Sequence, residues 1–157
     1  MATTEGSRVF LDTNVLVYAA ISQAPLHRES RMAIRRQQEA GTRLWISRQV
    51  LREYLATLSR PQTFSNPQPA DVLIQDVRHF EEWFSVADDG PAVTAKLLEI
   101  IGGFAVGGKQ VHDANIVATM ITNDIRVILT HNTDDYARFS GLISVLPITP
   151  DQRTRVD

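Results

Sequence analysis

Short apolar runs alternate with longer helical segments along the chain, and this alternation limits its fold more than any other feature. Residues 8–11, 44–46, 127–130 and 143–146 are rich in Val, Ile, Leu or Phe and are too short to form buried helices. We expect each to be a strand buried on both faces. Strands that alternate with helices predict a three-layer α/β domain with a central, mainly parallel sheet.

The segments between these strands carry apolar residues at helical spacing. Helices are expected over residues 13–21, 26–39, 48–58, 71–84 and 92–101, with a further one around residues 116–121. Ser47 is a favourable N-cap, Gly41 is expected to end the second helix, and Pro61 to stop the third. Residues 62–69 are rich in Pro, Gln, Asn and Ser, which predicts a loop and the one natural place for flexibility.

The composition bounds the class of protein. A chain of 157 residues buries about two-thirds of its surface as one domain, so we expect a single domain over residues 1–157 with a core from about 8 to 147 and short flexible termini. Cysteine is absent, which rules out disulfides. No apolar run is long enough to cross a bilayer, so the expectation is a cytoplasmic protein without a membrane partner. A formal net charge of -2 argues against general electrostatic binding of nucleic acid but leaves room for a local basic patch.

A single carboxylate, Asp12, interrupts the apolar run VFLDTNVLVYAA at residues 9–20. It falls at the end of the first expected strand, and ligands bind at the carboxyl ends of the strands in parallel sheets. Aspartate is also a preferred N-cap for the helix that follows. The residue alone leaves both roles open.

Two further acids lie on helices. Asp113 falls on the same helical face as Ile116, Val117 and Met120, so it is expected to point inward from the first turn of its helix. A buried carboxylate needs a partner, and a helix cap, an arginine or a metal ion would each provide one. Glu53 lies at the rim of the apolar stripe on the helix after Ser47, where it can reach over the carboxyl edge of the sheet.

The strand end LTHNTDDY at residues 129–136 supplies further oxygen groups. The cluster is also favourable turn chemistry, especially at Asp134. If the sheet is parallel, Thr130 and Asp12 lie at the same edge. Oxygen ligands without cysteine suit Mg²⁺ or Mn²⁺ rather than zinc.

Several of these segments, taken together, resemble a known family. LDTNVLVYA, the Glu53 helix after a short strand, VHDANIVATM and ILTHNTDDYARF occur in the order found in PIN-domain ribonucleases, and among these the sequence is most similar to the VapC-type toxins of bacterial toxin-antitoxin pairs. The resemblance runs from Arg8 to about Pro147. It implies a PIN-like three-layer α/β/α domain, an acidic cluster that binds Mg²⁺ or Mn²⁺, and hydrolysis of RNA phosphodiester bonds. It also implies a homodimer and a cognate antitoxin protein that blocks the site.

The resemblance also implies roles for individual residues. It assigns catalytic and metal-binding roles to Asp12, Glu53 and Asp113. At the fourth acidic position of many members this chain has Asn132, which brings no negative charge, so one metal or two remain open and Asp135 is a possible substitute. The candidates for supporting hydrogen bonds or the fourth position are Thr13, Asn14, Thr130, Asn132 and Asp135, and the candidate for substrate phosphate is Lys109.

Three alternatives deserve comparison with this interpretation. The sequence G-x-x-x-x-G-K at residues 103–109 matches a P-loop, but Gln110 replaces the required Ser or Thr and a helical segment precedes it instead of a strand. A phospho-receiver domain needs an acidic pair near the first strand, where only Asp12 is available. The strongest alternative is a PIN-like module that binds RNA or protein without cutting, for which Asn132 is the best argument. The sequence identifies neither the RNA nor the antitoxin.

Overall fold

The computed structural model describes residues 6–149, which form a sheet of five strands with helices on both faces. The strands are β1 (Arg8–Leu11), β2 (Arg43–Ser47), β3 (Ser85–Ala87), β4 (Val127–Thr130) and β5 (Ser144–Pro147), in the spatial order β3-β2-β1-β4-β5. Every neighbouring pair is parallel. The predicted parallel sheet is confirmed, and the expected flexible termini lie outside the described residues.

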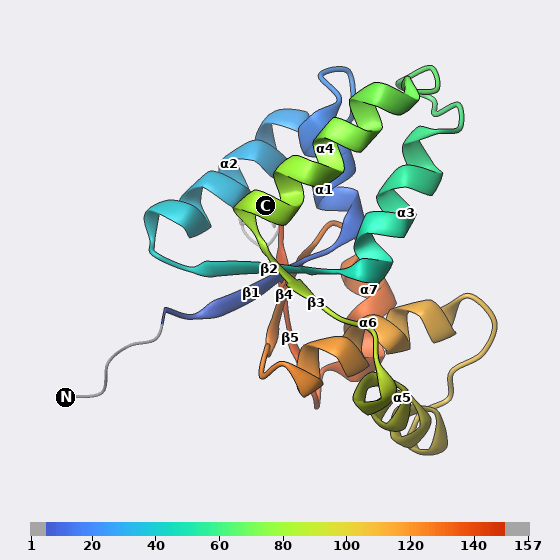
Figure 1. Ribbon diagram of the computed structural model, residues 1–157. Coiled ribbons are helices and arrows are strands. Elements are labelled where there is room, and N and C mark those ends of the chain that lie inside the picture. Colours follow the sequence, from blue (N-terminus) through green and yellow to red (C-terminus); the bar gives the residue numbers. More distant parts are fainter. Residues whose placement is uncertain (1–5, 150–157) are drawn as a thin grey trace, which may run out of the picture.

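The helices form two layers around the sheet. Figure 1 shows α1 (Thr13–Ala20), α2 (His27–Glu39), α3 (Arg48–Leu58) and α4 (Ala70–Trp83) on one side, with α5 (Pro91–Gly103) and α6 (Gln110–Thr122) on the other. The short helix α7 (Thr133–Tyr136) and the 3₁₀ turn η1 (Ala137–Phe139) lead into β5. This is the three-layer α/β/α arrangement that the alternating pattern predicts. None of the helices in residues 6–149 combines the length and the apolar character that a membrane span requires.

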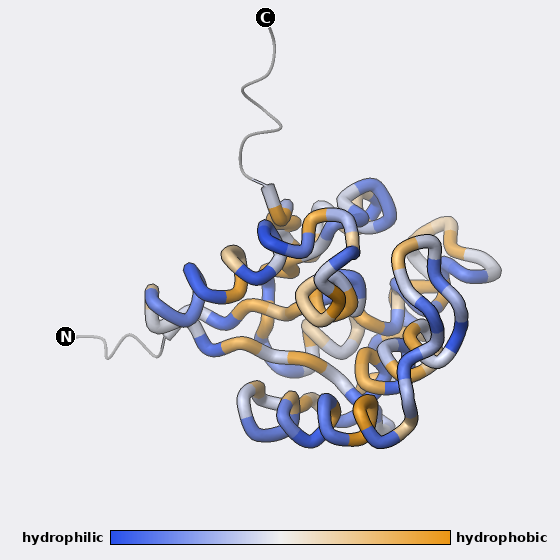
Figure 2. The backbone as a smooth tube through the Cα atoms, turned by 90° about the horizontal axis from the view of Figure 1, so that it is seen from above, coloured by the Kyte–Doolittle hydropathy of each residue, from blue (hydrophilic) through white to orange (hydrophobic). Residues whose placement is uncertain are grey.

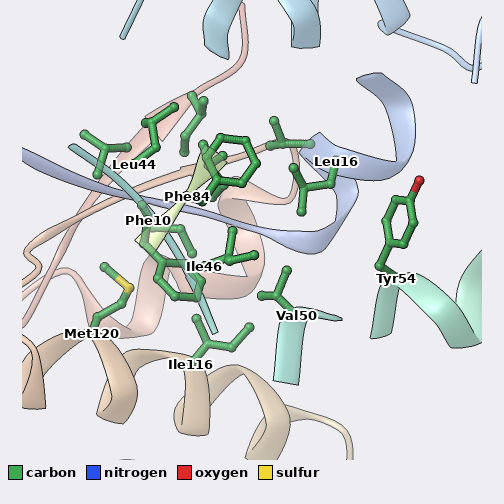
Figure 3. Close-up of a cluster of buried hydrophobic side chains, with 14 of the residues drawn as sticks. Phe10, Leu16, Leu44, Ile46, Val50, Tyr54, Phe84, Ile116 and Met120 are labelled. Carbon is green, nitrogen blue, oxygen red and sulfur yellow. The ribbon is translucent and has the colours of Figure 1, made fainter. Parts of the chain in front are cut away.

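The core is built around β1, the middle strand. Phe10 pairs in register with Trp45 of β2 and Ile128 of β4, and its side chain is fully buried. Figure 3 shows Phe10 beside Ile46 and Met120, between the sheet and α6. In Figure 2 hydrophobic residues follow the strands and hydrophilic residues the outer turns of the helices. Burying β1 on both faces explains why its sequence is apolar up to Asp12.

The strand β3 is the main element that the sequence pattern does not predict. Residues 85–87 were expected to lie in the link after a helix, and three residues are too few to show a period. They form a strand because their backbone pairs with β2, with Ile46 opposite Val86 and Ser47 opposite Ala87. Tertiary pairing therefore defines this edge of the sheet.

The predicted helix ends agree with the structure in most places. Ser47 Oγ accepts a hydrogen bond of 3.2 Å from the Val50 amide at the start of α3. Gly41, with a φ of 77°, follows the end of α2 as expected. The prediction that α2 begins at residue 26 was wrong by one position, because Leu26 adopts a left-handed conformation with a φ of 56°.

The polar loop after α3 is tied back onto that helix. The backbone amide of Gln68 donates to the Leu58 carbonyl at 2.8 Å, and the side-chain Nε2 of Gln62 donates to the Thr57 carbonyl at 2.7 Å. Gln62 and Ser65 also pair through their backbones in an isolated bridge. The loop is present where the sequence predicts it, and these bonds fix its shape against the end of α3.

Candidate active site

A cleft of about 380 Å³ opens at the carboxyl edge of the sheet. Its lining brings together residues that follow β1 and β4 with residues of α3, the loop after α3, and α6. The predicted site residues on its wall are Asp12, Thr13, Asn14, Glu53, Asp113, Asn132 and Asp135. Thr130 is fully buried and bonded to Asp12. Lys109 is exposed at the N-cap of α6 and does not line the cleft.

Asp12 caps α1 and also lies in the wall of the cleft. Its Oδ1 accepts a hydrogen bond of 2.8 Å from the Thr13 amide, which caps α1. Its Oδ2 accepts from Thr130 Oγ1 at 2.8 Å and from Asn14 Nδ2 at 3.3 Å. The side chain is only 6% exposed, yet it forms part of the cleft wall. The cap and the cleft therefore use the same carboxylate.

The environment of Asp12 disfavours its charge. The pKa of this carboxyl is raised from 3.8 to about 6, mainly by burial and also by the nearby Glu53 carboxylate, while the hydrogen bonds from Thr130 and Thr13 oppose the rise. A pKa near neutrality on an aspartate is typical of functional sites. A cation in the cleft would favour the charged form and reverse the shift.

Glu53 is held from two sides. Its Oε2 accepts a hydrogen bond of 2.7 Å from Thr13 Oγ1, and its Oε1 accepts one of 2.8 Å from Gln49 Nε2. Gln49 Nε2 also donates to the His112 carbonyl at 3.0 Å, and Gln49 Oε1 accepts from Asn115 Nδ2 at 2.8 Å. The buried Gln49 side chain thus joins α3 to the start of α6 and orients Glu53.

Asp113 projects from the first turn of α6 into the cleft. The pKa of its carboxyl is raised to about 6, mainly by burial and also by the carboxylates of Asp135, Asp12 and Glu53, while Arg138 opposes the rise. Negative charges from four separate segments therefore act on one another in this cleft. The sequence pattern predicts that Asp113 faces inward, and the structure places it half-buried.

The donor set is suited in its chemistry to a hard divalent cation. It consists of carboxylate oxygens whose mutual repulsion such an ion would offset. Within residues 6–149 there is no group of three Asp, Glu or His side chains that is already gathered as a metal site. The carboxylates share one cleft, and both oxygens of Glu53 already accept hydrogen bonds from protein groups.

Asn14 and Thr130 join the ends of β1 and β4. Asn14 Nδ2 donates to Asp12 Oδ2 and to Thr130 Oγ1, both at 3.3 Å, and its Oδ1 accepts from the His131 amide at 3.0 Å. The Asn132 amide donates to Thr130 Oγ1 at 3.0 Å. These bonds fix the backbone that follows β4 beside Asp12, whereas the Asn132 side chain is exposed at the cleft.

The far wall of the cleft contains residues that sequence reasoning missed. They come from α1, the end of α3 and the loop that follows, and they are Val17, Tyr18, Ala56, Thr57, Arg60, Gln62 and Phe64. Arg60 is the positively charged member of the lining. Gln49, which lies one helical turn before Glu53, was also missed. That spacing was the available clue, since residues four apart on a helix are neighbours.

The fold and the cleft define a class of protein: a parallel α/β domain with carboxylates gathered at the carboxyl edge of its sheet. The family model of the PIN domain matches residues 9–142, so the chain belongs to the PIN domain family. The predicted membership of this family is confirmed. No curated protein matches the chain in sequence.

Several solved structures share the fold. VapBC from Salmonella typhimurium, bound to DNA, has a chain with a TM-score of 0.67 and 16% identity, over 91% of this chain and 99% of that one. VapBC2 from Rickettsia felis, bound to a promoter DNA fragment, has a chain with a TM-score of 0.64 and 17% identity, over 89% of this chain and 98% of that one. Mycobacterium tuberculosis VapC20, described as a toxin that cleaves the sarcin-ricin loop, has a TM-score of 0.65 and 16% identity, over 88% of this chain and 99% of that one.

Proposed function

We propose that this protein is a divalent-metal-dependent endoribonuclease and the toxin of a toxin-antitoxin pair. The observation that carries the proposal is the pair Asp12 and Asp113, which lie on different elements of one cleft and both have a pKa raised to about 6. Membership of the PIN domain family supports a nuclease. The description of the Mycobacterium tuberculosis structure as an RNA-loop-cleaving toxin supports RNA as the substrate.

Each residue of the cleft has a proposed part in phosphodiester hydrolysis. Mg²⁺ or Mn²⁺, when bound, supplies Lewis-acid stabilisation of the phosphate and lowers the pKa of a coordinated water. Asp12 and Asp113 would hold the ion, and Thr130 and Asn14 hold the Asp12 carboxylate in place. Glu53, fixed by Thr13 and Gln49, would orient the attacking water.

The remaining candidates act on the charge of the site or of the substrate. Asn132 and Asp135 also line the cleft, and of these two only Asp135 could offer a negative charge to a second ion. Lys109, exposed at the start of α6, meets RNA phosphates outside the cleft. Because Asn132 brings no negative charge, the site would hold one ion firmly until the substrate arrives.

The proposed partners follow from the same family. Three of the similar structures are described as VapBC or toxin-antitoxin assemblies, which supports a cognate antitoxin that covers the cleft. We also propose a homodimer and a cytoplasmic location, as for VapC-type toxins. Size-exclusion chromatography with light scattering tests the dimer directly.

Cleavage of a mixed structured RNA pool tests the central proposal. The purified protein is incubated with Mn²⁺ or Mg²⁺, with EDTA, and as the variant Asp113→Asn. Asp71→Asn is a matched control, because Asp71 also lies in the first turn of a helix but is exposed and outside the cleft. We expect cleavage that requires both the ion and Asp113 and is unchanged in the control.

A non-cutting PIN-like module is the second candidate. It is favoured by Asn132 in place of an acid and by the lack, within residues 6–149, of three carboxylates already gathered for an ion. Such a module would bind RNA or its protein partner equally well with and without EDTA. Folded protein that cuts no RNA in the pool but binds it in EDTA would establish this alternative.

A further inference from the structure

A second hollow adjoins the acidic cleft, and we propose that it binds the unpaired bases of a single-stranded RNA. This hollow, the amide groove, has a volume of about 580 Å³ and lies between the end of α1 and the loop after α3. Its lining is Ala20, Ile21, Ser22, Gln23, Gln62, Thr63, Phe64, Ser65, Asn66 and Gln68. Gln62 and Phe64 line both hollows, so the amide groove begins where the cleft ends. The inference rests on the proposed function, since it concerns the substrate of that cleft.

The lining of the amide groove carries no charged side chain. Carboxamides provide most of its hydrogen-bonding capacity, and they come from Gln23, Gln62, Asn66 and Gln68. A carboxamide both donates and accepts hydrogen bonds, as the edges of nucleic-acid bases do, and Asn and Gln pair with such edges. Lys and Arg, the side chains that attract phosphate most strongly, are absent from the lining. The chemistry therefore favours bases over the sugar-phosphate backbone.

Hydrogen bonds within the protein orient two of these carboxamides. Gln62 Nε2 donates to the Thr57 carbonyl at 2.7 Å, and Gln68 Nε2 donates to Ser65 Oγ at 2.9 Å and to the Asn66 carbonyl at 3.1 Å. These bonds use the amino ends. They leave the carbonyl oxygens as acceptors fixed in place for the amino groups of bases. A wall held in this way loses little entropy when a ligand binds.

Aromatic rings lie where the two hollows meet. Phe64 and Tyr18 are half-buried and pack edge to face, with centroids 5.9 Å apart, and Tyr18 contacts the His131 ring in the same manner at 5.5 Å. Exposed ring faces are where single-stranded bases stack. Arg60 lines the cleft beside this junction. A strand whose scissile phosphate lies at the carboxylates can thus place its next phosphate toward Arg60 and its adjacent base over Phe64.

A binding comparison without cleavage tests the proposal. The variant Asp113→Asn is titrated with a labelled random-sequence single-stranded RNA and with an abasic strand of equal length, and fluorescence anisotropy gives each Kd. We expect the base-bearing strand to bind about tenfold more tightly or better. The double change Gln23→Ala with Asn66→Ala should reduce that advantage by about tenfold. Both residues are exposed, so the fold is retained.

A control variant removes a carboxamide that lies elsewhere on the surface. Gln38→Ala removes an exposed carboxamide from α2, outside both hollows, and should leave the advantage of the base-bearing strand unchanged. Equal affinity for the two strands, or an advantage that survives the double change, would overturn the base-binding role of the amide groove. Because the measurement requires no cleavage, a failure of the nuclease proposal appears in the RNA-pool assay and not here.

Discussion

The hydroxyl group of Thr130 donates a hydrogen bond of 2.8 Å to Oδ2 of Asp12, which links the ends of β4 and β1 across 118 positions of sequence. The same oxygen of Thr130 accepts from the Asn132 amide at 3.0 Å. One buried hydroxyl thus satisfies a carboxylate and fixes the first residues after β4. The position of the Asp12 carboxylate therefore depends on β4 as much as on β1.

Replacing Thr130 with valine tests this dependence. Valine keeps the shape but removes the hydroxyl, so the Asp12 carboxylate loses a donor and the Asn132 amide loses an acceptor. We expect the free energy of unfolding to fall by about 1–3 kcal/mol in urea denaturation. Thr130→Ser retains the hydroxyl and should lose less. A larger loss in Thr130→Ser than in Thr130→Val would show that packing of the methyl group, and not the hydrogen bond, matters.

The two raised pKa values predict how the metal-free protein responds to pH. Asp12 and Asp113 have pKa values of about 6 in the folded chain and near 3.8 when unfolded, so the folded state binds more protons between these values. The contribution of these two carboxyls to stability therefore falls as pH rises from about 4 to about 6. Above that range, Asp113→Asn removes a repelled charge and should raise the free energy of unfolding by on the order of 1 kcal/mol, a figure reduced for solvent screening.

The measurement is urea unfolding in EDTA at about pH 8 and about pH 4.5. The gain from Asp113→Asn should be largest at the higher pH and clearly smaller at the lower one, where the aspartate is protonated in the folded state but still largely ionised in the unfolded chain. Asp71→Asn, at an exposed first-turn position, should show no such dependence. A gain of the same size at both pH values would contradict the role of charge repulsion.

The sequence predicts those parts of the site that local patterns determine. Asp12 follows an apolar run, and Asp113 shares a helical face with Ile116 and Met120, so an inward or edge position can be inferred from spacing alone. By contrast, β3 is a strand only because β2 pairs with it. Arg60 follows the end of α3 and lines the cleft, with its Nε donating to the Ala56 carbonyl at 3.0 Å. The pairing that defines β3 leaves no period in the sequence.

Gln49 supports Glu53 in the structure, and its replacement tests whether this support matters for activity. It holds Glu53 Oε1 at 2.8 Å and the His112 carbonyl at 3.0 Å, so its removal frees the Glu53 carboxylate and loosens α3 from α6. In the proposed nuclease, Gln49→Ala should lower kcat about tenfold with little change in KM, as losses of supporting hydrogen bonds do at metal sites. A rise in KM alone would place Gln49 in substrate binding instead.

Tyr54 joins α3 to α4 and offers a test of the fold apart from the cleft. Its hydroxyl donates a hydrogen bond of 2.7 Å to Asp76 Oδ2, and burial together with this carboxylate raises the pKa of the phenol above its ordinary value. Tyr54→Phe keeps the edge-to-face contact with Phe80 at 4.9 Å and removes only the hydroxyl. We expect the free energy of unfolding to fall by about 1–2 kcal/mol, because Asp76 is half-buried and water replaces part of the lost bond.

Tyr18→Phe, at a half-buried tyrosine, is the control for removing a hydroxyl and should cost less than about 0.5 kcal/mol. Equal losses in the two variants, measured by urea unfolding, would mean that the bond to Asp76 does not hold α4 against α3.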